Sequence, residues 1–254
     1  MKKSIKILAI GNSSSVDGME YLWHVLSNSG YDEIILGNLA IASCTVEMHA
    51  DNVRSNAPLY QYGKNVSGSW MWELDKPFTY GFLDEEWDII TLQQASGFSG
   101  IADTYNRKNE IVDFISTHKR NPDAKILWHM TWAYDNDSPH NHFEFYGKNQ
   151  HDMYRAIISA VKKEIISDSA FFGVIPSGVA IQNLRENTSI ALTRDSFHLS
   201  ESHGRYTAAL TWACAICDVD LNCVDWMPIQ YKTEISAYID SIKKSVTDAM
   251  NFEF

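Results

Sequence analysis

Three side chains that together could cleave an ester lie in two short segments near opposite ends of the chain. Ser13 belongs to the early segment, and the later one reads Asp195-Ser196-Phe197-His198. At this spacing the carboxylate can bond one imidazole nitrogen and fix the tautomer, so the other nitrogen can take a proton from a serine. A serine hydroxyl is a weak nucleophile without such a base. The sequence therefore predicts a serine hydrolase in which Ser13 is the nucleophile, His198 the base and Asp195 the orienting acid.

Each segment also has a simpler structural interpretation. Residues 11–15, Gly-Asn-Ser-Ser-Ser, are typical of a strand-to-helix turn, in which Ser15 is the best-placed N-cap. Residues 195–198 can form a turn in which the aspartate caps the backbone and the histidine is satisfied locally. Both segments together, at opposite ends of one α/β pattern, favour the hydrolase.

The elements that must position these residues alternate between strands and helices. Apolar runs typical of buried strands occur at residues 5–10, 33–36, 88–92, 125–131 and 171–175. Helical apolar spacing occurs at residues 19–26, 104–119, 149–167, 206–217 and 233–250. Alternation of this kind predicts a parallel sheet with helices on both faces. We therefore expect a three-layer α/β/α fold with a five-stranded parallel sheet.

The expected site lies at one edge of that sheet. Ser13 follows the first apolar run by a few residues, and ligands of open α/β sheets bind at the carboxyl ends of the strands. Two long polar loops, 134–146 and 182–194, can help to build the site. Residues 65–87 are rich in aromatic residues and glycine, which indicates an inserted hairpin. Without repeats or linkers, residues 1–254 are expected to form one domain.

Composition excludes several classes of function. The chain has 21 basic and 32 acidic side chains and a formal charge of −11, which disfavours nucleic acids and anionic membranes as partners. No stretch reaches the ~18 apolar residues of a membrane span. Met1-Lys2-Lys3 leads directly into the first strand without a visible signal peptide. Cytoplasmic residence is the default expectation; a removed leader would imply a periplasmic or secreted protein.

No metal or other cofactor is expected. Cys214 and Cys217 have CxxC spacing but lie in a helical segment without a second pair, so structural thiols are the preferred interpretation. The loop after the fourth strand contains Asp135, Asp137, His140 and His142, which could be taken for a metal site. We interpret it instead as a solvated polar loop at the rim of the pocket.

Both segments resemble the SGNH (GDSL-type) hydrolase superfamily, and the resemblance spans most of the chain. Residues 10–13 are similar to its Gly-Asp-Ser block, which carries the nucleophile after strand 1. Residues 195–206 are similar to its Asp-x-x-His block, which supplies the acid and the base. The resemblance implies a flavodoxin-like sheet in the order 2-1-3-4-5 and the same three catalytic residues. It also points to an uncharacterised branch that is frequent in polysaccharide-degrading bacteria.

The family's oxyanion hole has a different composition here. Ala42-Ser43 stands where the second block has glycine, and Gln93-Gln94 stands where the third block has asparagine. We expect the oxyanion donors to be the N–H of Ser13, an N–H of Ala42 or Ser43, and the Gln94 amide. A buried structural role for Gln94 is the alternative. The loss of one donor costs about 10²–10³ in turnover.

The substrate is less well defined by the sequence. The candidate substrate contacts are Gln93, Trp132 and Asn12, which replaces the first block's Asp. For Trp132, packing in the core is the preferred interpretation. Family analogy and the aromatic content suggest a short acyl ester, such as acetyl on a carbohydrate. The main alternative is a non-catalytic carbohydrate-binding member of this fold; a phosphate binder that uses the turn at residues 11–15 is disfavoured by its single glycine. The oligomeric state stays open.

Overall fold

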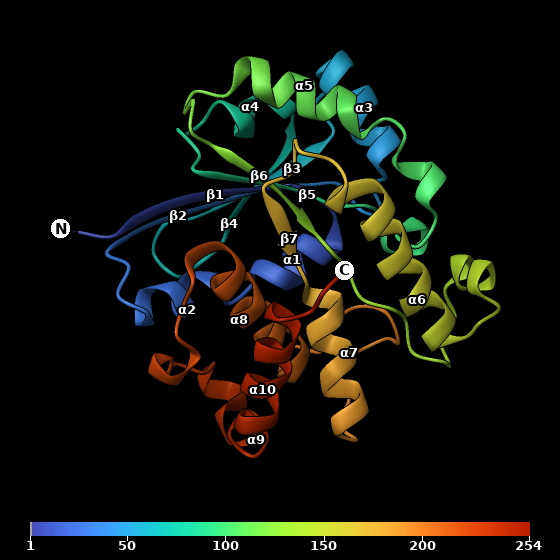
Figure 1. The fold of residues 1–254 in the computed structure, drawn as a ribbon. Coiled ribbons are helices and arrows are strands. Elements are labelled where there is room, and N and C mark those ends of the chain that lie inside the picture. Colours follow the sequence, from blue (N-terminus) through green and yellow to red (C-terminus); the bar gives the residue numbers. More distant parts are fainter. Residues whose placement is uncertain (1) are drawn as a thin grey trace.

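A seven-stranded mixed sheet forms the centre of the protein in the computed structural model, which describes residues 2–254 (Figure 1). In spatial order its strands are β4 (Met71–Lys76), β3 (Tyr60–Asn65), β2 (Glu33–Ala40), β1 (Ser4–Gly11), β5 (Ile89–Leu92), β6 (Lys125–His129) and β7 (Gly173–Ile175). The five neighbouring strands β2, β1, β5, β6 and β7 are parallel. β3 is antiparallel to β2, and β4 is antiparallel to β3. The prediction of a five-stranded, all-parallel sheet is therefore wrong, and the order 2-1-3-4-5 does not describe the whole sheet.

The two additional strands form a hairpin at the edge of the sheet. The hairpin covers residues 60–76, and α4 (Phe78–Phe82) follows it, so the predicted hairpin at 65–87 was placed too late in the chain. The side chains of β4 are almost all exposed. An exposed edge strand lacks the buried apolar alternation that identifies a strand in a sequence, which explains the error.

Helices cover both faces of the sheet, as the alternating pattern predicted. In Figure 1, the helices above the sheet are α3 (Val46–Ser55), α4 and α5 (Lys108–His118). Those below it are α1 (Ser13–Met19), α2 (Leu22–Asn28), α7 (Ser177–Asn187), α8 (His203–Cys217), α9 (Lys232–Ser236) and α10 (Ile239–Met250). α6 (Gln150–Val161) continues into a π-helical turn, η4 (Lys162–Ile166). The 3₁₀ helices are η1 (Ser96–Phe98), η2 (Ala102–Tyr105), η3 (Asn141–Tyr146), η5 (Leu221–Cys223) and η6 (Ile229–Tyr231).

The central strands are apolar along their length and polar where they end. Residues Ile7 to Ile10 of β1 are fully buried, because helices pack on both faces of a central parallel strand. Asn12 follows β1, Gln93 follows β5 and His129 ends β6. Parallel strands end at the same edge of the sheet, so these polar side chains meet there. Among residues 2–254, none of the helices has the length and apolar composition that a bilayer-spanning segment requires.

Candidate active site

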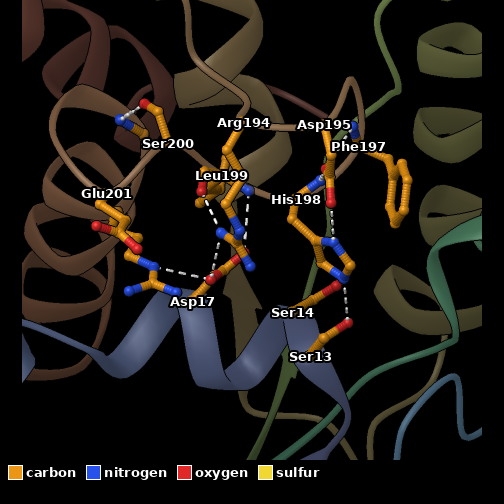
Figure 2. Close-up of polar contacts among 12 residues, drawn as sticks. Ser13, Ser14, Asp17, Arg194, Asp195, Phe197, His198, Leu199, Ser200 and Glu201 are labelled. Carbon is orange, nitrogen blue, oxygen red and sulfur yellow. Dashed lines mark hydrogen bonds and ion pairs between the residues drawn. The ribbon is translucent and has the colours of Figure 1, made fainter.

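Ser13, His198 and Asp195 form one continuous chain of hydrogen bonds (Figure 2). Ser13 Oγ lies 3.0 Å from His198 Nε2, and His198 Nδ1 lies 2.6 Å from Asp195 Oδ2. An ionised carboxylate can only accept, so Nδ1 carries the proton and Nε2 can accept from the serine hydroxyl. The structure thus brings the three predicted residues together with the geometry of a nucleophile, a base and an orienting acid.

The serine is held at the start of α1 by the residue before it. Asn12 has an extended backbone, and its Oδ1 accepts a hydrogen bond from the Ser14 N–H at 2.9 Å. Asn12 is therefore the N-cap, and the expectation that Ser15 caps this helix is wrong. The Ser15 hydroxyl is buried and donates to the Asn12 carbonyl oxygen. Because α1 begins at Ser13, the Ser13 hydroxyl lies at the carboxyl edge of the sheet.

A tight loop presents the histidine and the aspartate. The Arg194 N–H donates to the His198 carbonyl oxygen, and Ser196 has a left-handed backbone with φ of 68°. Asp195 Oδ1 accepts the His198 N–H at 2.7 Å, so one carboxylate fixes both the backbone and the ring. Partial burial raises the pKa of Asp195, but the hydrogen bonds from the ring and the backbone of His198 outweigh it and lower this pKa below its usual value. The carboxylate is therefore ionised at neutral pH.

A buried carboxylate joins the nucleophile helix to this loop. Asp17, one helical turn after Ser13, has a side chain that is 1% exposed. It accepts hydrogen bonds from Arg194 Nη1 at 3.0 Å, Arg205 Nε at 2.8 Å and the Leu199 N–H at 2.9 Å (Figure 2). The sequence analysis missed this role. The available signal was a carboxylate within the first helix and an arginine shortly after the histidine.

The backbone N–H groups of Ser13 and Ser43, two residues that line the cavity, are the candidate oxyanion donors. Ser43 lines the same cavity as Ser13 and has a left-handed backbone, with φ of 55°. The Ser43 N–H donates no hydrogen bond within residues 2–254, and the Ser13 N–H, at the first helical position, has no intrahelical acceptor. Ala42 is exposed and does not line this cavity. Of the two predicted positions in this segment, Ser43 is the one that faces the site.

The Gln94 amide is directed away from the cavity. Its Oε1 accepts the N–H groups of Val46 and Ala95, and its Nε2 donates to the carbonyl oxygen and the hydroxyl of Thr104. All of its hydrogen-bonding groups are thus engaged, and Gln94 does not line the cavity. In this structure Gln94 lacks a free donor for the oxyanion and has the structural role that was the alternative.

Gln93 instead belongs to a buried polar chain beneath the serine. Its Nε2 donates to Asn12 Oδ1 at 2.7 Å, and its Oε1 lies 2.9 Å from His129 Nδ1. Asn12 Nδ2 donates to the Cys44 carbonyl oxygen, and His129 Nε2 lies 3.1 Å from Ser177 Oγ. Burial lowers the pKa of His129 to about 3, so the ring is neutral. Gln93 is out of reach of a substrate, whereas Asn12 lines the cavity and is held by this chain.

The cavity at the triad is small, about 90 Å³. Its lining is Asn12, Ser13, Ser43, Ala95, Ser96, Gly97, Phe98, His140, His142, Phe197 and His198. The polar loop predicted at the rim of the pocket thus contributes His140 and His142 to the lining, although the sequence analysis gave neither residue a role of its own. Trp132 is buried, and its Nε1 donates to the Phe197 carbonyl oxygen. This side chain therefore stabilises the loop that carries Asp195 and His198, and it is not exposed to a sugar. Within residues 2–254, no group of three or more His, Cys, Asp or Glu side chains could hold a metal ion.

The fold and this site define an α/β protein with a serine, histidine and aspartate at the carboxyl edge of its sheet. Residues 6–249 match the family model described as a domain of unknown function, DUF4886. The chain belongs to this family. A DUF4886 family protein from Bacteroides uniformis has 35% sequence identity and a TM-score of 0.91, with 98% of this chain and 96% of that chain covered. No curated protein matches.

More distant structures share the fold. A candidate SGNH hydrolase from Slackia heliotrinireducens has 17% identity and a TM-score of 0.56, with coverage of 83% of this chain and 98% of that chain. A catalytic mutant of an acetylxylan esterase from Geobacillus stearothermophilus has 11% identity and a TM-score of 0.51, with 85% and 96% covered. The predicted superfamily is thus matched at the level of the fold.

Proposed function

We propose that this protein is a serine esterase of the SGNH type that hydrolyses short acyl esters. The observation that carries the proposal is the hydrogen-bonded chain from Ser13 through His198 to Asp195. The fold shared with SGNH hydrolases and acetylxylan esterases supports a hydrolase.

Each of these residues has a defined task in the proposed reaction. His198 Nε2 takes the hydroxyl proton as Ser13 Oγ attacks the acyl carbonyl, and Asp195 stabilises the imidazolium. The N–H groups of Ser13 and Ser43 bind the oxyanion. His198 then protonates the departing alcohol, which leaves an acyl-enzyme on Ser13. Water deprotonated by His198 attacks this acyl group, and the carboxylic acid and free Ser13 are regenerated.

The size of the cavity supports a short acyl group. The cavity measures about 90 Å³, whereas an engineered protein cavity of roughly 150 Å³ holds benzene. An acetyl group suits this space, and a long acyl chain does not. The acetylxylan esterase from Geobacillus stearothermophilus, which shares the fold, supports an acetyl group on a carbohydrate as the substrate.

Turnover of an acetyl ester by the parent and by Ser13→Ala tests the proposal. We expect the parent to release acetate and the substitution to lower kcat by about 10⁴- to 10⁶-fold, because the nucleophile is removed. The thermal midpoints of the two proteins should agree, since among residues 2–254 Ser13 Oγ bonds only His198. Absence of hydrolysis by a folded parent, or equal rates for the two proteins, would overturn the proposal.

A further inference from the structure

The cavity around Ser13 adjoins a second, more open hollow. This hollow has a volume of about 350 Å³, within the usual range of small-molecule sites. It is lined by Pro139, His140, Asn141, His142 and Phe197. His140, His142 and Phe197 line both spaces. An ester whose acyl group occupies the smaller cavity would therefore extend its alcohol into the second hollow.

The linings of both spaces are free of groups that would select a charged alcohol. Among the described residues that line them there is no Lys, Arg, Asp or Glu. Burial, followed by the nearby His142 and His198, lowers the pKa of His140, so this imidazole is neutral at neutral pH. The nearby Asp195 carboxylate already accepts hydrogen bonds from the backbone and the ring of His198, so a charged alcohol would lose hydration here without a free counter-ion. The lining thus favours a neutral alcohol.

The two histidines offer hydrogen-bonding groups that the protein itself leaves free. His140 Nδ1 accepts the His142 N–H at 3.2 Å, so the proton of the neutral His140 ring is on Nε2. Within residues 2–254, neither His140 Nε2 nor either ring nitrogen of His142 has a hydrogen-bond partner. Hydroxyl groups of a bound alcohol are suitable partners for these nitrogens.

Aromatic rings surround these nitrogens. The His142 ring lies 4.5 Å from the Phe98 ring and stacks on the Phe145 ring at 5.2 Å, and Phe145 is 55% exposed. The Phe197 ring lies 5.1 Å from the His140 ring. Gly97 holds His142 close to η1, since a Cβ at that position would lie 2.6 Å from His142 Cβ. Apolar ring faces beside polar nitrogens suit a ligand with apolar faces and hydroxyl edges.

We propose that His140, His142 and Phe197 form the alcohol subsite, and that this subsite binds a neutral, hydroxyl-bearing ring such as a pyranose. The inference rests on the proposed ester hydrolysis and concerns the part of the ester that leaves. The imidazole nitrogens bond the ring hydroxyls, and the face of Phe197 contacts the C–H face of the ring.

The first test compares two esters that share the acetyl group and differ in the alcohol. His142→Phe keeps an aromatic ring beside Phe145 and removes both nitrogens. We expect the ratio of kcat/KM for monoacetylated methyl xyloside to kcat/KM for ethyl acetate to fall about 3- to 10-fold, the loss of one neutral hydrogen bond. His151→Phe, at an exposed position on α6, is the control and should leave the ratio as in the parent. An unchanged ratio in His142→Phe, or a parent that prefers acetylcholine to the acetylated xyloside, would overturn the subsite.

The second test measures binding without turnover. In the Ser13→Ala background, calorimetry with methyl xyloside should show weaker affinity after His142→Phe is added, and equal affinity would overturn the subsite. If the parent hydrolyses no acetyl ester, the proposed function fails, and this comparison alone decides the subsite. The two failures are therefore distinguishable.

Discussion

The Asp17 carboxylate accepts a hydrogen bond from the Leu199 N–H at 2.9 Å, across most of the length of the chain. Asp17 lies on the helix that begins with Ser13, and Leu199 directly follows His198. This contact joins the element that carries the proposed nucleophile to the loop that carries the proposed base. The same carboxylate also binds Arg194 and Arg205. Asp17 is therefore a positioning residue for the triad.

Asp17→Asn should weaken both the fold and the reaction. The substitution leaves two guanidinium groups without their buried counter-charge, which we expect to lower the free energy of unfolding by about 3 kcal/mol. It should also lower kcat more than it changes KM, because the distance from Ser13 to His198 is no longer held. Urea unfolding and acetyl-ester kinetics measure the two effects.

Asp152→Asn is the matched control for this substitution. Asp152 forms an exposed ion pair with Arg155 on α6, and such pairs contribute at most about 1 kcal/mol. We expect this variant to unfold and react nearly as the parent does. Similar losses in the Asp152 and Asp17 variants would show that the buried carboxylate has no special role.

Gln94→Ala distinguishes a structural glutamine from an oxyanion donor. The substitution leaves the N–H groups of Val46 and Ala95 without the acceptor that Gln94 provides, so we expect a loss of stability of about 1–3 kcal/mol. At a temperature where the variant is folded, kcat should fall by much less than the 10²-fold typical of a lost oxyanion donor. The opposite result, a large loss of kcat at unchanged stability, would show that Gln94 donates to the oxyanion.

The buried histidine beneath the serine predicts an acid-sensitive fold. The pKa of His129 is about 3 in the folded protein because of burial, whereas the unfolded chain takes up this proton below pH ~6.5. Between these values the unfolded state binds more protons, so stability falls as the pH falls. The contribution of His129 approaches 1.4 kcal/mol per pH unit below about pH 5.5. His49, also buried with a pKa of about 3, adds to the effect.

His129→Gln tests the source of this sensitivity. Urea unfolding between pH 7 and pH 4.5 should show a shallower loss of stability in this variant than in the parent. His118→Gln, at an exposed position on α5, should leave the slope unchanged. A slope in His129→Gln as steep as in the parent would mean that His129 takes up its proton without unfolding.

Short-range features were readable from the sequence. Ser13 was placed after the first strand because a mainly apolar run ends at Ile10, shortly before it. Asp195 and His198 were paired because a spacing of three residues allows a local turn to bring them into contact. The helices on both sides of a sheet followed from apolar periodicity, which is a property of each segment by itself.

The tertiary structure decided which polar groups are partners. Gln93 and Gln94 are adjacent and chemically identical, yet one faces Asn12 and the other faces Thr104, because successive residues at a strand end point to opposite sides. Asp17 and Leu199 meet only through the packing of the chain. A sequence pattern gives the period of an element, but a hydrogen-bond partner depends on which groups distant elements leave unpaired. The bounds of the edge hairpin, and the contribution of His140 and His142 to the lining of the cavity, were decided by the folded chain for the same reason.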